Sequence, residues 1–182
     1  MKIMIGRKIV SPYFIRRLTA EDEQFLWEML YVALHVPAGQ PPFSREVVDE
    51  PGIARYVLHW GKGGDTGFVA VDASTSLPVG AAWVRVFTAE NKGYGYVDDE
   101  IPELSIAVLP EYRAKGIGTD LLRHLIEEVR FRHRALSLSV SSDNPAIRLY
   151  QRLGFEIVAQ SGASLTMKKQ LDDRDGGHRC SS

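Results

Sequence analysis

Residues 103–122 read ELSIAVLPEYRAKGIGTDLL, and this stretch predicts a strand, a tight turn and the start of a helix. Leu104, Ile106 and Val108 alternate with smaller residues, which is the period of a β-strand. From Thr119 onward the apolar residues recur with a helical period instead. The change of period within one short stretch predicts a strand that leads directly into a helix.

Gly116 and Gly118 lie at the turn between this strand and this helix. They lack the Cβ atoms that would keep a ligand away from the backbone. The first N–H groups of the helix have no acceptor within the helix and point at the same place. Such an arrangement binds anions, most often a phosphate group, so the turn is a candidate phosphate site.

Two motifs resemble those of a known family. The segment Arg113-Ala-Lys-Gly-Ile-Gly118 resembles the Arg/Gln-x-x-Gly-x-Gly/Ala signature of the GNAT N-acetyltransferase superfamily. Residues 144–155, NPAIRLYQRLGF, resemble the second GNAT signature, Asn-x-x-Ala-x-x-x-Tyr-x-x-x-Gly-Phe, with Ala146 at the small-residue position or one position before it. The two motifs have the order and spacing of the family, and the resemblance extends by element order over residues 13–170.

The element pattern predicts an α/β fold of mixed type. Strands are expected at 13–18, 67–72, 79–87, 103–109, 135–140, 155–159 and 164–168, with helices that begin at Thr19, Ser44, Pro51, Thr119 and Asn144. The helix from Pro51 is expected to reach Trp60, and 88–102 is expected to be a mobile loop. With the resemblance, this order implies the GNAT acyl-CoA N-acyltransferase fold: a twisted mixed sheet of about seven strands with helices on both faces.

Length and composition limit the possible classes of protein. The 182 residues fit one domain, expected at 13–170, with an N-terminal extension at 1–12 and a disordered tail at 171–182. A net charge of −1 gives no indication of nucleic acid or membrane binding. No secretion signal or membrane helix is expected, and the single cysteine, Cys180, fits the cytoplasm. The five histidines make no metal-binding pattern, so no metal is expected.

The resemblance implies acetyl-CoA as co-substrate. The backbone around the turn would hold its pyrophosphate, Arg113 would add charge, and the backbone of Val108 would donate to the thioester carbonyl. In the family fold, the strand at 103–109 and the strand after the next helix diverge, and pantetheine lies between them. The implied cofactor-binding residues are Ile106, Ala107, Val108, Arg113, Ala114, Lys115, Gly116, Ile117, Gly118, Thr119, Asn144 and Tyr150.

Acetyl transfer to an amine needs a base for the amine, a donor for the oxyanion and a proton for the leaving thiolate. The family match makes Tyr150 the candidate acid, although its helical spacing also suits a core residue. Glu103 is the candidate base, and the alternative is a glutamate in solvent at a strand end. Asp98, Asp99 and Glu100 are rival bases, or together an acidic mouth that attracts a cationic amine.

The predicted function is therefore transfer of an acetyl group from acetyl-CoA to a primary amine, by direct attack in a ternary complex. The amine is a small molecule or a peptide, and a homodimer is left open. The alternative is a non-catalytic acyl-CoA-binding domain that regulates a partner. Both functions need the glycine turn, but only the enzyme needs an acid and a base. Candidate walls of an acceptor pocket are Trp27, Trp60, Trp83, Tyr94 and Tyr96.

Overall fold

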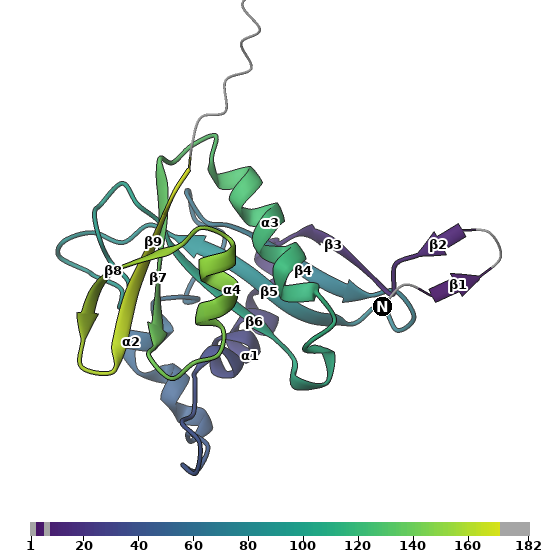
Figure 1. Cartoon of the computed structure of the whole chain (residues 1–182), viewed down its shortest axis with the longest axis horizontal. Helices are drawn as coiled ribbons and strands as arrows, with labels where there is room; N and C mark the ends of the chain where they lie inside the picture. Colours follow the sequence, from purple (N-terminus) through teal and green to yellow (C-terminus); the bar gives the residue numbers. More distant parts are fainter. Residues whose placement is uncertain (1–2, 6–7, 172–182) are drawn as a thin grey trace, which may run out of the picture.

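The computed structural model describes residues 3–5 and 8–171, and its centre is one seven-stranded mixed sheet (Figure 1). The strand order is β3-β4-β5-β6-β7-β9-β8, with β6 and β7 as the parallel pair. The strands are β3 Tyr13–Arg17, β4 Thr66–Asp72, β5 Pro78–Arg85, β6 Glu103–Val108, β7 Ala135–Ser141, β8 Glu156–Ser161 and β9 Ser164–Gln170. The predicted mixed sheet is confirmed.

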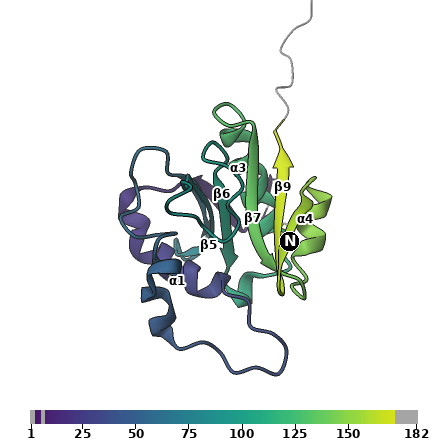
Figure 2. The ribbon, with the colours of Figure 1, turned by 90° about the vertical axis from the view of Figure 1, so that its left-hand side faces the viewer.

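Within the part of the chain that the structure describes, four α-helices and three short 3-10 turns connect these strands. The α-helices are α1 Glu23–Ala33, α2 Pro51–Ala54, α3 Ile117–Val129 and α4 Ile147–Arg152. The 3-10 turns are η1 Ala20–Asp22, η2 Arg45–Asp49 and η3 Pro110–Tyr112. Figure 2 shows α1 on one side of the sheet and α3 on the other.

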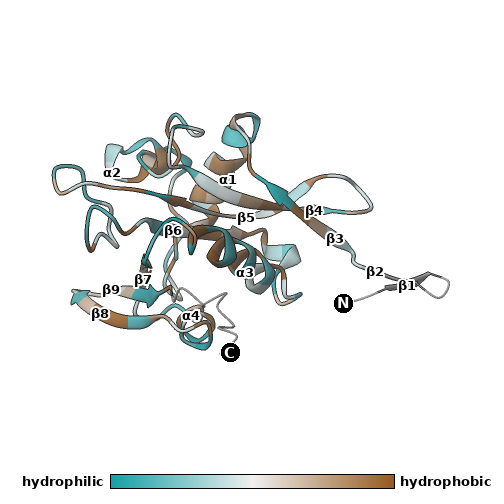
Figure 3. Ribbon diagram, turned by 90° about the horizontal axis from the view of Figure 1, so that it is seen from above, coloured by the Kyte–Doolittle hydropathy of each residue, from teal (hydrophilic) through white to brown (hydrophobic). Residues whose placement is uncertain are grey.

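The central strand β5 explains why both faces are covered. Successive side chains of a strand point to opposite faces. Ala82 and Val84 belong to the hydrophobic cluster that contains α3, whereas Ala81 and Trp83 belong to the cluster that contains α1. All four side chains are buried. Figure 3 shows the hydrophobic β4 and β5 running between the helices.

Helix α3 is held on the sheet by one apolar stripe. Its buried residues are Ile117, Leu121, Leu122, Leu125 and Val129. Burial of each such side chain contributes about 1.5–3 kcal/mol, so the stripe is the main reason that α3 stays on this face. The same packing holds the N-terminus of α3 beside the end of β6.

Two helix predictions need correction. The helix expected to run from Pro51 to Trp60 ends at Ala54 and continues as turns. The buried guanidinium of Arg85 binds the carbonyls of Arg55, Leu58 and His59, which removes them as acceptors for a continuing helix. Helix α3 begins at Ile117, two residues before the predicted Thr119, since Gly116 caps it.

The ends of the chain differ in part from the expected boundaries. β1 Ile3–Ile5 and β2 Lys8–Val10 form an antiparallel hairpin within the expected extension 1–12, and it projects from the sheet (Figure 1). Leu171, assigned to the tail, is buried, and its N–H donates to the carbonyl of Arg134 at 2.8 Å. The rest of the predicted tail, with Cys180, lies outside the described residues.

Candidate functional site

The sheet opens between β6 and β7. These strands pair at Glu103 and Ser137, where the Ser137 N–H also donates to the carbonyl of Pro102 at 3.1 Å. Within residues 3–5 and 8–171 this is the one β6–β7 pair, and β7 pairs with β9 along its whole length. The divergence that the resemblance implied is therefore present, and it leaves one side of β6 without a strand partner.

The backbone of β6 directs polar groups into this gap. The N–H of Leu109 donates to the carbonyl of Val79 at 2.9 Å, which makes Gly80 and Val108 a non-hydrogen-bonded pair. The N–H and C=O groups of Val108 therefore point away from β5. Because this pattern repeats at every second residue, the same groups of Ile106 face the gap as well.

The N-terminus of α3 lies beside this gap and is built as the sequence predicts. Ala114 and Gly116 both adopt left-handed backbone angles, with φ of 59° and 85°. The first intrahelical bond runs from the Asp120 N–H to the Gly116 carbonyl at 3.1 Å. The N–H groups of the first helical residues, up to Thr119, thus lack acceptors within the helix and are available to an anion.

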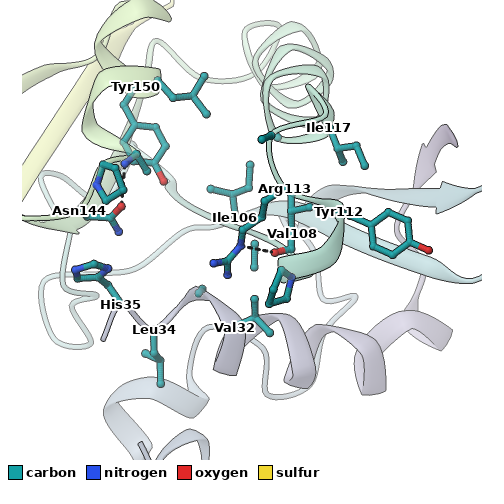
Figure 4. A pocket seen from close by; sticks show the side chains of 18 of the residues that line it. Val32, Leu34, His35, Ile106, Val108, Tyr112, Arg113, Ile117, Asn144 and Tyr150 are labelled. Atoms are coloured by element: carbon teal, nitrogen blue, oxygen red, sulfur yellow. Dashed lines mark hydrogen bonds between the residues drawn. The ribbon is translucent and has the colours of Figure 1, made fainter. Parts of the chain in front are cut away.

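A cavity of about 810 Å³ runs from this turn along β6 to the end of α1 and to α4 (Figure 4). The predicted cofactor-binding residues that line it are Ile106, Ala107, Val108, Arg113, Ala114, Gly116, Ile117, Gly118, Thr119, Asn144 and Tyr150. Lys115 is not among the lining residues, and its ammonium group lies 4.9 Å from the ring centroid of Tyr112. The Nε of Arg113 donates to the Val108 carbonyl at 3.1 Å (Figure 4).

A second cavity of about 180 Å³ lies deeper in the gap and meets the first. The residues common to both walls are Ala33, Leu34, His35, Ile106, Asn144 and Tyr150. Glu103 lines only the smaller cavity. The molecule therefore offers a long groove beside an anion-binding turn and a small chamber with a carboxylate, joined at the tyrosine predicted to be the acid.

Glu103 is buried, which excludes its alternative interpretation as a glutamate in solvent. Only 3% of the surface of this residue is exposed to solvent. Its Oε1 accepts hydrogen bonds from the Tyr56 hydroxyl at 2.7 Å and from the Gly95 N–H at 2.8 Å. Burial raises the pKa of Glu103 to about 7, against the opposing effect of these two donors. A carboxylate with this pKa is half ionised near neutral pH and suits a general base.

This burial predicts a pH-dependent stability. The folded protein holds the Glu103 proton more tightly than the unfolded chain, so the free energy of unfolding is highest below the ordinary pKa of glutamate and falls as the pH rises towards 7. The expected fall is up to about 3 kcal/mol. Chemical denaturation between pH 4 and pH 8 measures it. The free energy of unfolding of Glu103→Gln should not show this fall, so its difference from the wild-type value should narrow at low pH. If the variant kept the wild-type dependence of stability on pH, the raised pKa would not belong to Glu103.

Tyr150 lies in the wall of both cavities and in the core, so both of its predicted roles are structurally possible. Its side chain projects from α4 into the groove that Ile106 and Val108 face (Figure 4). The residue is 8% exposed, and burial raises its pKa to about 12. It therefore carries its proton at neutral pH, as an acid must. Its ring makes an edge contact with Phe155 at 6.0 Å between centroids.

Asn144 holds the turn before α4 rather than the helix itself. Its Oδ1 accepts the N–H of Ala146 at 2.9 Å, and the α-helix begins at Ile147. The predicted helix cap at Asn144 is therefore wrong: the residue that caps α4 is Ala146, and a turn separates Asn144 from the helix. The amide faces both cavities.

The acidic rivals of Glu103 lie outside the site. Asp98 is half-buried and Glu100 is exposed, and they lie 3.3 Å and 3.7 Å from the guanidinium of Arg134. Asp99 accepts a hydrogen bond from the Tyr96 hydroxyl. None of the three lines either cavity. Of the five aromatic candidates for an acceptor pocket, Tyr94 lines the small cavity, and Trp83 is a fully buried core residue.

The sequence analysis missed two residues of the site. His35 follows the end of α1 and lines both cavities, with its Nε2 3.1 Å from a carboxylate oxygen of Asp143 (Figure 4). Tyr56 lines the small cavity and binds Glu103. Neither belongs to a motif. Tyr56 lies in a predicted helix, and no local signal distinguishes it from a core residue.

In the described residues no group of three or more His, Cys, Asp or Glu side chains is placed to hold a metal ion. None of the helices in residues 3–5 and 8–171 is long and apolar enough to cross a membrane.

Known structures share this fold. The acetyltransferase yncA of Salmonella typhimurium, solved with acetyl-CoA, has a TM-score of 0.63 at 22% identity and covers 93% of this chain and 100% of its own. The ribosomal-protein-alanine N-acetyltransferase of Brucella melitensis has a TM-score of 0.60 at 25% identity, with coverages of 87% and 99%. Residues 63–157 match the acetyltransferase (GNAT) domain model, and the chain belongs to the GNAT family.

One curated relative shares a shorter segment at higher identity. The [ribosomal protein bS18]-alanine N-acetyltransferase of Escherichia coli K12 is 48% identical over 59 residues, which are 31% of this chain. The match spans 40% of the length of that relative. This match therefore supports the family assignment.

Proposed function

We propose that this protein is an N-acetyltransferase that transfers the acetyl group of acetyl-CoA to a primary amine by direct attack in a ternary complex. One observation carries the proposal: the groove beside the α3 N-terminus joins a small chamber that contains the buried carboxylate of Glu103. The domain that does this is proposed to be residues 13–170. The cytoplasm is its proposed compartment, on the basis of a single cysteine.

The groove fits coenzyme A in shape and in polar groups. A Cβ at Gly118 would lie 3.8–4.0 Å from the side chains of Ile106, Val108 and Leu149, so the absence of a side chain keeps this end of the groove open. The α3 N–H groups would bind the pyrophosphate, and Arg113 would add positive charge. The N–H and C=O groups of Ile106 and the N–H of Val108, which point away from β5, suit the amide-rich pantetheine arm.

Acetyl-CoA supplies an acetyl thioester whose carbonyl carbon is the electrophile. The amine nitrogen forms the new C–N bond, and the C–S bond breaks. Glu103 takes the proton that the amine loses, directly or through water, and the Val108 N–H donates to the carbonyl oxygen as it gains charge. Tyr150 gives its proton to the departing thiolate. Glu103 lines the small chamber, Tyr150 lies at the junction of the two cavities, and Val108 lines the groove.

The proposed acceptor is a small amine or a peptide N-terminus, with no metal, nucleic acid or membrane involved. Peptides that begin with alanine enter the first panel because of the Escherichia coli and Brucella relatives. The proposal is compatible with a homodimer. The molar mass of the protein in solution decides between a monomer and a homodimer.

An assay of released thiol from acetyl-CoA tests the proposal, with a panel of small amines, polyamines and N-terminal peptides. Acetylated product from at least one amine is the expected result, with mass spectrometry to identify the nitrogen that is modified. If calorimetry shows that coenzyme A binds and no amine in a broad panel is acetylated, the regulatory acyl-CoA-binding function becomes the better explanation.

Tyr150→Phe should lower kcat by roughly 100-fold or more, because the thiolate would leave without a proton donor. The ring and its contact with Phe155 remain, so the variant should fold and bind coenzyme A as the wild type does. Steady-state kinetics at saturating acetyl-CoA measure the effect, and calorimetry provides the control. An unchanged kcat would make Tyr150 a core residue only.

A further inference from the structure

Tyr56 joins the candidate base to the loop that covers it. Its hydroxyl donates to Oε1 of Glu103 at 2.7 Å and accepts the Tyr94 N–H at 2.6 Å. Its ring lies parallel to that of Tyr94, with centroids 6.3 Å apart, and makes an edge contact with Phe87 at 5.0 Å. The residue is 7% exposed. The hydroxyl thus links the buried Glu103 to the backbone of the exposed Tyr94.

The position of Tyr56 is itself fixed by the core. The indole N–H of the fully buried Trp83 donates to the Tyr56 carbonyl at 3.0 Å. The guanidinium of Arg85, which is also bound to Asp65 at 3.0 Å, donates to the carbonyl of the preceding residue, Arg55, at 2.8 Å. The phenol therefore meets the carboxylate from a rigid backbone, as a preorganised hydrogen-bond donor does.

The covering loop touches the carboxylate at two glycines. The Gly95 N–H donates to the same Oε1 at 2.8 Å. A Cβ at Gly95 would lie 2.5 Å from the carbonyl carbon of Leu138, and a Cβ at Gly93 would lie 2.1 Å from Oε2 of Glu103. Glycine is required at both positions because the loop backbone lies directly on the carboxylate and on β7.

The two oxygens of Glu103 are therefore unequal. Oε1 accepts two hydrogen bonds, from Tyr56 and Gly95. Oε2 is buried and has no hydrogen-bond partner among the residues that the structure describes. A buried carboxylate oxygen without a donor is costly and is usually explained by function.

We propose that Tyr56 is a positioning residue for the acetyl transfer: it fixes Glu103 through Oε1 and leaves Oε2 as the atom that receives the proton of the amine. This inference rests on the proposed function, because it gives Glu103 its role as base. Tyr56 acts through Glu103. The proposal thus gives a role to a residue that no motif of the chain contains.

The Tyr56 hydrogen bond also adjusts the acidity of the base. A donor favours the ionised carboxylate, so the Tyr56 hydroxyl lowers the pKa of Glu103 against the effect of burial. Loss of the hydroxyl should raise that pKa further. The other charged or titratable groups around Glu103 are Arg55 and Tyr94 on the adjoining segments, Arg85 opposite it on β5, and His35 and Tyr150 in the same cavity wall. Tyr56→Phe leaves all of them in place.

The first test measures the carboxyl group itself, without turnover. The ¹³C signal of the Glu103 carboxyl carbon, assigned by its absence in Glu103→Gln, is followed from pH 4 to pH 9. Tyr56→Phe should raise the pKa of Glu103 by about 1, the size expected for one hydrogen bond to a charged group. An unchanged pKa in a folded variant overturns the proposal. Should Tyr56→Phe fail to fold, 3-fluorotyrosine at position 56 is the second variant: as a stronger donor it should lower the pKa, and no change would again overturn the proposal.

Tyr13→Phe is the matched control. The Tyr13 hydroxyl also donates to a carboxylate, Asp120 Oδ2 at 2.6 Å, but Tyr13 lines neither cavity. Its loss removes a hydrogen bond of the same kind from another part of the fold. It should affect stability and leave the titration of Glu103 unchanged.

The second test is a double-mutant cycle on kcat/KM. Tyr56→Phe should lower kcat/KM at pH 7 by roughly tenfold, and should move the acidic limb of the pH profile upward by the same amount as the carboxyl titration. In the Glu103→Gln background it should have no further effect, since it acts through Glu103. A full loss that persists in that background overturns the proposal. If no amine is ever acetylated, the proposed function fails, and the ¹³C titration still decides the Tyr56–Glu103 interaction.

Discussion

Gly118→Glu should weaken the binding of coenzyme A by at least about 100-fold, one of the two largest effects expected from a single substitution. A Cβ at this position would lie in ordinary contact with Ile106, Val108 and Leu149, three residues of the groove wall, so a longer side chain must enter the groove. The added carboxylate would also occupy the helix N-terminus in place of the phosphate, where it would repel the phosphate's negative charge.

Isothermal calorimetry with coenzyme A and with acetyl-CoA measures this loss. Gly63→Glu is the control, because a Cβ at Gly63 meets nothing within 4 Å and the residue lines neither cavity. The control should bind as the wild type does. Micromolar binding retained by Gly118→Glu would show that the pyrophosphate lies elsewhere, and the assignment of the groove would then be wrong.

Glu103→Gln should lower kcat/KM by about 100-fold to 1000-fold, the second large effect. Burial raises the pKa of Glu103 to about 7, so the ionised base accumulates as the pH rises through 7, and kcat/KM should rise with it. Glutamine cannot take a proton. The limb centred near pH 7 should therefore disappear in the variant, while any limb that belongs to the amine itself remains.

The pH profile of kcat/KM between pH 5.5 and pH 9.5 measures this change. Glu100→Gln is the matched control, since Glu100 is an exposed neighbour of Arg134 and lines neither cavity. Its profile should follow that of the wild type. If the limb near pH 7 persists in Glu103→Gln, the group that titrates there is another residue, and Glu103 is not the base.

The elements that carry the groove were predictable from local sequence. The alternation of apolar and smaller residues at 104–108 predicts the strand β6. The helical period of the apolar residues from Thr119 onward predicts α3. The glycine at 116 is needed because the backbone there has a φ of 85°. These features depend on residues close together in the chain, so their pattern remains visible without the fold.

The roles within the site were less predictable. The sequence left Glu103 equally suited to catalysis and to solvent, and could not choose between it and three acidic neighbours. Its hydrogen-bond donors are Tyr56 and Gly95, which are 47 and 8 residues away along the chain. Asp98 and Glu100 form ion pairs with Arg134 outside the site. Such contacts follow no period and leave no local pattern.

The sequence by itself determined the family resemblance, the order of the elements and the glycine turn before α3, because these depend on backbone conformation and on periods of two or 3.6 residues. The tertiary structure alone decided which carboxylate is buried, where the helix after Pro51 ends, and that His35 and Tyr56 line the small cavity. The physical reason is that desolvation and hydrogen bonding of a side chain depend on all the elements around it, and the chain brings these together only when it folds.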